Sequence, residues 1–173
     1  MLTSLSCVPE VSTSGYYVFD ASSVPKTVGA ADFRMLVVDG PETLETILLL
    51  DLEHDEARLG KDFCTRRVHR RKAVYLSDEG VNAYICYFKG EAVGNCELSV
   101  FGDTAKIENF AVAPKEQGKG YGTAMLAVLI DIAISKNVAT LYLEADEDDA
   151  AKELYKKRGF SKVFECTDLF FHV

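Results

Sequence analysis

Along the middle of the chain, β-prone runs are separated by short glycine turns, a pattern typical of neighbouring strands. Strands are predicted over residues 82–88, 92–100 and 105–112, separated by the turn sequences Lys89-Gly90-Glu91 and Gly102-Asp103. Because turns this short join neighbouring strands, the three strands are expected to form an antiparallel meander. Another strand is predicted over residues 33–38. The β-prone run 16–19 predicts one short strand in an otherwise irregular segment, residues 1–32.

Elsewhere the apolar residues recur every three or four positions, which predicts helices. One helix is expected over residues 41–56, with Pro41 in its first turn, and the charged stretch 57–72 is expected to be helical in part. A helix over 120–136 is apolar on most sides and should be largely buried. The last helix is predicted over 148–158, ending at Gly159. Strands are predicted at 140–143, 160–165 and 169–173.

The order of these elements predicts the fold class. The strand–helix–strand order between residues 107 and 143 is a crossover, and a crossover joins parallel strands. We therefore expect an α/β fold with a mixed, mostly antiparallel sheet and helices on both faces. Residues 33–173 are expected to form one domain, and residues 1–32 an N-terminal extension.

Composition narrows the class of partner. The net charge of −8 argues against nucleic acid, because phosphate binding depends on Lys and Arg. The five cysteines are scattered without a CxxC pair, and His54, His69 and His172 lack the spacing of metal ligands, so no metal site is predicted. No apolar run approaches the roughly 20 residues of a membrane span, and the first residues lack the pattern of a secretory signal. We expect a cytoplasmic protein with no membrane partner.

The segment most informative about function is Gln117-Gly118-Lys119-Gly120-Tyr121-Gly122, between a predicted strand and a long helix. The first amides of a helix have no acceptor within it, and glycines let phosphate oxygens approach such amides closely. A P-loop is excluded because Gly rather than Ser or Thr follows Lys119. The spacing also differs from the GxGxxG of dinucleotide-binding folds. An acyl-CoA loop and an ordinary helix start with glycines are the two remaining interpretations.

Two motifs together resemble those of the GCN5-related N-acetyltransferase (GNAT) family. Within residues 107–122, Gln117, Gly120 and Gly122 fill the three fixed positions of the family's Q/R-x-x-G-x-G/A loop. Residues 151–160 resemble the family's A-x-x-L-Y-x-x-x-G-F helix end. The close match covers residues 107–160, with coarser agreement in element order over residues 33–173.

The resemblance implies an N-acetyltransferase that moves an acetyl group from acetyl-CoA directly to a primary amine of a small molecule or peptide. A bulged strand would pair with the pantetheine through the backbone of Phe110, Ala111 and Val112. Backbone amides would hold the pyrophosphate, and these belong to Gln117, Gly118, Lys119, Gly120, Tyr121, Gly122 and Thr123. Tyr155 would protonate the departing thiolate or, alternatively, fill the core with its ring. Asp148 stands where the family often has an Asn that contacts the cofactor; alternatively, it caps the last helix.

Other segments have two interpretations each. Glu108 is the candidate general base if it faces the cleft, and a solvated acid if it does not. The basic run Arg66–Lys72 would bind the 3′-phosphate of CoA, steer an anionic substrate or meet an acidic partner, or it is a solvated helix face. The apolar run Leu169–Phe171 would support a homodimer or belong to the core. A non-catalytic acyl-CoA-binding regulator is the alternative function, and the presence of Tyr155 favours the enzyme.

Overall fold

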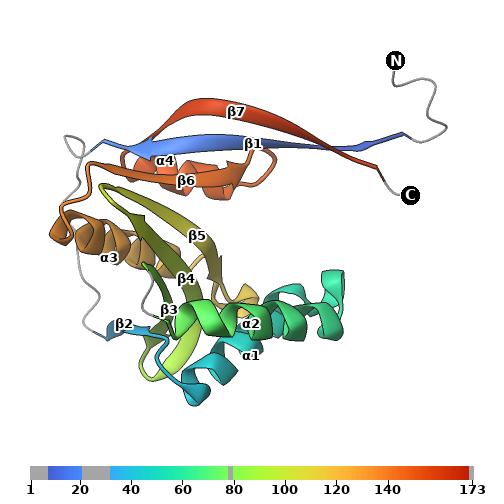
Figure 1. The fold of residues 1–173 in the computed structure, drawn as a ribbon, viewed down its shortest axis with the longest axis vertical. Coiled ribbons are helices and arrows are strands. Elements are labelled where there is room, and N and C mark those ends of the chain that lie inside the picture. The colour runs from blue at the N-terminus through green and yellow to red at the C-terminus, as the bar shows by residue number, and fades with distance from the viewer. Residues whose placement is uncertain (1–7, 21–31, 78–79, 172–173) are drawn as a thin grey trace. The chain divides into compact units, whose positions relative to one another are not determined.

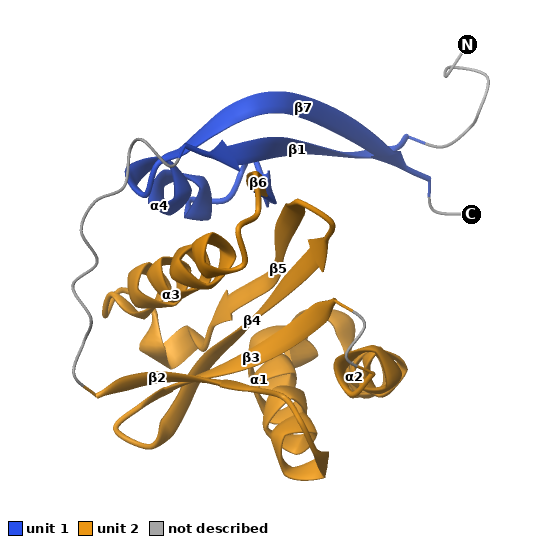
Figure 2. Cartoon of the chain, turned by 60° about the vertical axis from the view of Figure 1, so that its left-hand side comes forward, with its two compact units in different colours: residues 1–24, 142–173 blue, residues 25–141 orange. Residues whose placement is uncertain are grey.

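Figure 1 shows the computed structural model, which describes residues 8–20, 32–77 and 80–171. Its strands are β1 (Glu10–Phe19), β2 (Phe33–Val37), β3 (Val81–Phe88), β4 (Glu91–Phe101), β5 (Thr104–Val112), β6 (Thr140–Asp146) and β7 (Phe160–Phe170). Its helices are α1 (Pro41–Leu59), α2 (Lys61–Tyr75), the 3-10 turn η3 (Pro114–Glu116), α3 (Tyr121–Ser135) and α4 (Ala151–Lys157). The chain divides into two compact units (Figure 2): a central unit of residues 25–141 and a terminal unit of residues 1–24 and 142–173.

The sheet of the central unit has the strand order β2-β3-β4-β5, with every neighbouring pair antiparallel. This arrangement confirms the predicted meander, and its strand bounds lie within one residue of the predicted ones. The turns also fall where the sequence predicts them, and Lys89, Gly90 and Gly102 all have positive φ there. The β-prone runs and the glycine turns between them were therefore a sufficient guide to this sheet.

Helices cover both faces of the central sheet, as expected. On one face, α1 and α2 pack against β3, and apolar residues of α1 form a core with Ala83 and Ile85. On the other face, α3 contacts β4 and β5 and is apolar on most sides, as predicted; it buries Met125, Leu126 and Leu129. Figure 1 shows α3 and the α1–α2 pair on opposite sides of these strands.

In the terminal unit, β1 lies between β6 and β7 and is antiparallel to both. The short strand predicted at residues 16–19 is the end of this ten-residue strand. The predicted break between strands 160–165 and 169–173 was wrong, because β7 runs unbroken from Phe160 to Phe170 along its ladder with β1. Residues 172–173 of the second predicted strand lie outside the described residues.

The last helix begins at Ala151 rather than at residue 148. The preceding acidic residues favour turns over helix, because their side chains bind nearby amides. Asp146 Oδ1 accepts the N–H of Asp148 at 2.8 Å, and Asp149 Oδ1 accepts that of Ala151 at 2.9 Å. These two bonds hold residues 146–149 out of the helix.

The end of β7 does not belong to the core. Leu169 and Phe170 are exposed, with exposed fractions of 43% and 51%. The homodimer therefore stays a prediction, with an apolar surface that is consistent with it. Within the described ranges of the chain, no helix is both long and apolar enough to cross a membrane.

Candidate functional site

A β-bulge interrupts β5 shortly before the glycine loop, where the resemblance places the strand that pairs with pantetheine. Asn95 pairs with Ala111 and Glu97 with Glu108, so two residues of β5 oppose the single residue between them on β4. Asn109, the first of the two, has φ 45°. Its carbonyl accepts a hydrogen bond from Asn95 Nδ2 at 3.3 Å. A bulge bends its strand, so residues 110–112 leave the regular ladder direction.

Gly94 lets β4 approach this segment closely. A Cβ atom at Gly94 would lie 2.4 Å from the carbonyl oxygen of Ala111 and 3.2 Å from Met125 Sδ. Gly94 pairs with Val112, at the end of β5. The absence of a side chain at Gly94 therefore allows the end of β5 and α3 to pack closely against β4.

The glycine loop leads from η3 into α3 and leaves amides free to bind an anion. Gly120 is the N-cap of α3 in the left-handed conformation, φ 88°, which favours glycine, and no side chain caps the helix. The first amides of α3 have no acceptor inside the helix. Gln117 Nε2 donates to the carbonyl of Val112 at 3.3 Å, and Lys119 pairs with Glu116 at 3.0 Å.

The structure thus brings most of the predicted cofactor-binding residues together in the central unit, on the bulged strand end and the loop that follows it. These residues are Phe110, Ala111, Val112, Gln117, Gly118, Lys119, Gly120, Tyr121, Gly122 and Thr123. The start of α2 is also a glycine with positive φ and no side-chain cap, Gly60, so what distinguishes the start of α3 is its position directly after the bulged strand. Tyr155 and Asp148 lie in the terminal unit.

Tyr155 lies in α4 and is almost fully buried, with its ring edge-on to Phe160 at 6.3 Å between centroids. Burial, together with the negative charge of Asp149, raises the pKa of Tyr155 to about 12. A phenol is protonated at neutral pH even with its ordinary pKa, and the raised pKa makes that of Tyr155 a weaker acid. Asp148 is exposed in the turn before α4, and Asp149 rather than Asp148 binds the first helical amide.

Glu108 is half-exposed and already holds a partner. Its Oε1 binds Lys106 Nζ at 2.8 Å, and its Oε2 accepts a hydrogen bond from Ser99 at 3.3 Å. The opposite residue on β4, Glu97, is buried instead. Glu97 also lines a cavity, whose wall does not include Glu108.

That cavity, of about 180 Å³, lies among α1, α2, β4 and the bulge of β5. Glu97 forms part of its wall, where its Oε1 accepts hydrogen bonds from Arg71 Nη1 (2.8 Å), Tyr75 and Asn109. Burial and the negative charge of Glu97 raise the pKa of Tyr75. The other carboxylate oxygen of Glu97, Oε2, has no hydrogen-bond partner among the described residues. Since no solvent-inaccessible polar side-chain atom of these residues lacks a partner, Oε2 is accessible, and we infer that it faces the cavity that Glu97 lines.

A second group of charges lies across the cavity from Glu97. Arg67 binds both Asp51 and Asp55 of α1, and Asp55 also binds Arg58 at 3.1 Å and His54 at 3.2 Å. Burial alone would raise the pKa of Asp55, but these hydrogen bonds lower it to about 2. Over the part of the chain that the structure describes, no group of three or more His, Cys, Asp or Glu is placed to hold a metal ion.

The sequence analysis missed this cavity. The one available signal was spacing: Asp51 and Asp55 are four residues apart on α1, and Arg67 and Arg71 four apart on α2. Residues four apart share a helix face, so the two pairs were candidates for facing each other. Nothing in the sequence showed that Glu97 would join them.

The model of the acetyltransferase (GNAT) family matches residues 47–160, about two thirds of the chain. The chain belongs to the GNAT family. Its GNAT relatives include an alanine N-acetyltransferase of ribosomal protein bS18 from Haemophilus influenzae, 43% identical over 61 residues (35% of this chain and 42% of that protein). An uncharacterised N-acetyltransferase of Bacillus subtilis is 29% identical over 124 residues, 69% of this chain and 47% of the relative. The chain thus spans somewhat less than half the length of these curated relatives.

Solved structures confirm the predicted fold class. A GCN5-related N-acetyltransferase from Sphaerobacter thermophilus superposes with a TM-score of 0.73, covering 97% of this chain and 54% of that one. The sequences are only 13% identical, so this likeness concerns the fold. The GNAT fold is therefore established independently of the loop motif from which it was predicted.

Proposed function

We propose that the chain transfers an acetyl group from acetyl-CoA to a primary amine. The observation that carries this proposal is the uncapped, glycine-led start of α3 directly after the bulge in β5. The amides of residues 117–123 would bind the pyrophosphate, and the backbone of residues 110–112 the pantetheine, as expected from the resemblance. Acetyl-CoA supplies a thioester carbonyl, which a neutral amine attacks directly.

We place the acceptor amine in the cavity beside the bulge. Glu97 Oε2 faces this cavity and can accept a hydrogen bond from an ammonium group and, directly or through water, its proton. Glu108 was the predicted base; both carboxylates hold an ion pair, but Glu97 lines this cavity and Glu108 lies outside its wall. We therefore favour Glu97, with Glu108 as the second candidate.

Tyr155 would donate a proton to the thiolate of CoA as the thioester breaks. Its raised pKa keeps the phenol protonated but makes it a weaker acid towards a thiolate, so the transfer would require direct contact between the phenol and the sulfur. The regulator remains the alternative function, in which the loop binds acyl-CoA without turnover. The cytoplasmic location and a contact between Asp148 and the cofactor stay predictions.

The first experiment is calorimetric titration with acetyl-CoA, with dephospho-CoA and NAD as controls, followed by a screen of amines for acetyl transfer. Gly120→Asp would place a carboxylate beside the pyrophosphate and should weaken acetyl-CoA binding by at least about 100-fold. Gly90→Asp is the matched control: Gly90 also has φ 88° and open space around its Cβ position, but lies in the β3–β4 turn.

Equal affinity of Gly120→Asp and Gly90→Asp for acetyl-CoA would show that the loop does not bind the cofactor. Saturable binding by the wild-type protein without transfer to any amine would favour the regulator. Binding together with transfer supports the enzyme.

A further inference from the structure

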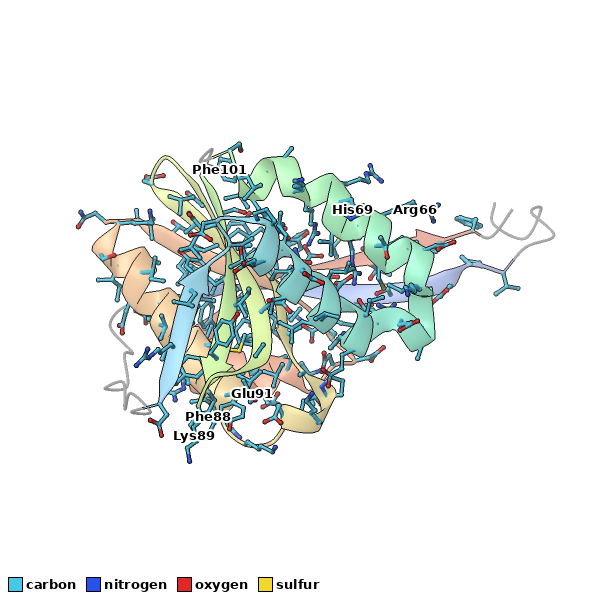
Figure 3. The ribbon with its side chains drawn as sticks, turned by 90° about the horizontal axis from the view of Figure 1, so that it is seen from below. Arg66, His69, Phe88, Lys89, Glu91 and Phe101 are labelled. Carbon is cyan, nitrogen blue, oxygen red and sulfur yellow. The ribbon has the colours of Figure 1, made fainter. Side chains whose placement is uncertain are left out.

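One face of α2 concentrates positive charge in a protein that is acidic overall. Phe63, Arg66, Arg67, Arg70 and Arg71 follow one another at intervals of three and one, which places them on the same side of the helix. Together they line a surface groove, which we call the arginine groove. Figure 3 shows Arg66 and His69 on this helix.

The arginine groove shares two residues with the cavity at Glu97. Arg67 and Arg71 line both. Their guanidinium groups bind the carboxylates of the cavity wall: Arg67 binds Asp51 and Asp55, and Arg71 binds Glu97. The cavity and the arginine groove are therefore adjacent.

Arg66 and Arg70 differ from these two. Both are exposed, and no ion pair of either is found among the described residues. The charges of Arg67 and Arg71 are neutralised by the acids that they bind, so Arg66 and Arg70 give the groove its net positive charge. Phe63 lies beside them and offers an apolar surface, with Arg67 over its ring at 5.5 Å.

The two sites thus present opposite charge over a short distance. The cavity offers an oxygen of Glu97 to a cation, and the groove offers Arg66 and Arg70 to an anion. Arg66 and Arg70 lie about one helical turn apart on α2, and one turn is about 5.4 Å. On this scale, we expect a cation in the cavity and an anion at Arg66 or Arg70 to be on the order of 10 Å apart. An extended peptide covers this distance in about three residues.

We propose that the acceptor is an anionic amine: a molecule whose primary amine enters the cavity while its own carboxylates bind Arg66 and Arg70. This proposal rests on the proposed function for the role of the cavity. Of the interpretations of the basic run Arg66–Lys72, it selects the steering of an anionic substrate. This run would then determine which acceptor the protein binds. A peptide with a free α-amine followed by acidic residues has the required spacing, whereas a small amino acid is too short to reach both sites.

Peptide binding in the presence of CoA, which has no acetyl group to transfer, tests this proposal without requiring turnover. Three tetrapeptides with the same N-terminal alanine, followed by three glutamates, three glutamines or three arginines, are titrated into the protein in the presence of CoA. Contacts of exposed charges are individually weak, so we expect the glutamate peptide to bind about tenfold more tightly than the glutamine peptide at low salt. The preference should shrink as the ionic strength rises. Free glutamate, as the small-molecule arm, should bind no better than glutamine.

The double variant Arg66→Glu/Arg70→Glu should lose this preference and favour the arginine peptide. The matched control is Arg34→Glu/Lys136→Glu, which makes the same charge change at exposed positions outside the groove and should keep the glutamate preference. Equal binding of the glutamate and glutamine peptides by the wild-type protein, or an unchanged preference in the double variant, would overturn the proposal. Failure of the proposed function would look different: the charge preference would persist while no peptide became acetylated.

Discussion

Replacing Glu97 by Gln tests the assignment of the amine site most directly. The substitution keeps the size of the side chain and one carbonyl oxygen, but removes the negative charge that faces the cavity. Two unit charges about 4 Å apart, with an effective dielectric constant near 20, attract each other by ~4 kcal/mol. Loss of this attraction for the ammonium corresponds to a fall in kcat/KM of about 10³-fold. Removal of a general base has an effect of similar size, roughly 10²–10⁴-fold.

The fold should tolerate this change. Arg71 loses its charged partner, but its side chain is 37% exposed, so water can solvate it. Tyr75 and Asn109 can still donate to the amide oxygen of Gln. We expect the free energy of unfolding to fall by only about 1 kcal/mol, which lowers the melting temperature by about 3 °C. Acetyl-CoA affinity should not change, because Glu97 lies outside the glycine loop.

The assay is release of the CoA thiol, followed with a chromogenic disulfide at saturating acetyl-CoA over a range of amine concentrations. Glu108→Gln is the matched control, since it removes a carboxylate from the facing position on β5 that does not line the cavity. Its kcat/KM should stay within about threefold of wild type, as expected for a half-exposed ion pair. Wild-type kcat/KM in Glu97→Gln would refute the assignment, and a 10³-fold loss in Glu108→Gln instead would make Glu108 the base.

Three further predictions concern positioning and protonation. Asp55 has a pKa below its ordinary value, so its ion pairs stabilise the fold above about pH 4, and this contribution is lost as the pH falls towards 2. Asp55→Asn should therefore reduce the free energy of unfolding by about 2 kcal/mol at pH 7. Denaturant titrations should show the difference between the variant and wild type vanishing near pH 2. Gly94→Ala should push the carbonyl of Ala111 away, which should cost about 1–3 kcal/mol of stability and weaken acetyl-CoA binding in calorimetry. The control Gly40→Ala has open space at its Cβ position and should leave the affinity for acetyl-CoA unchanged. Tyr155→Phe should lower kcat by at least about 100-fold with acetyl-CoA affinity retained, and wild-type kcat would show that Tyr155 is not the acid.

The fold of the central unit could be predicted from sequence because its signals are local. β-prone runs and short glycine turns define each strand of the meander, and neighbouring strands pair in chain order. The glycine loop lies at the start of α3, where the local sequence predicts it, and its binding role stays a prediction. The strands and turns of the meander, which depend on nearby residues, were therefore confirmed.

The cavity and the terminal unit depend on residues far apart in the chain. Asp51 and Arg67 are 16 residues apart, and Arg71 and Glu97 are 26 apart, on three different elements. Their separate patterns look like ordinary solvated helix faces and an alternating strand. The start of α4 failed for another reason: acidic side chains that can cap a helix also form turns, and here they do the latter.

The position of β1 has a consequence for the order in which the protein is made and folded. β1 ends at Phe19, but its two neighbours in the sheet, β6 and β7, begin only at Thr140 and Phe160. At roughly 5–20 residues per second, β1 waits on the order of ten seconds on the ribosome before its partners exist. The central unit needs only the contiguous residues 25–141 and can form during that interval. β1 can complete its pairing only after β7 has been made, so a folded central unit can coexist with a terminal unit that is still unpaired.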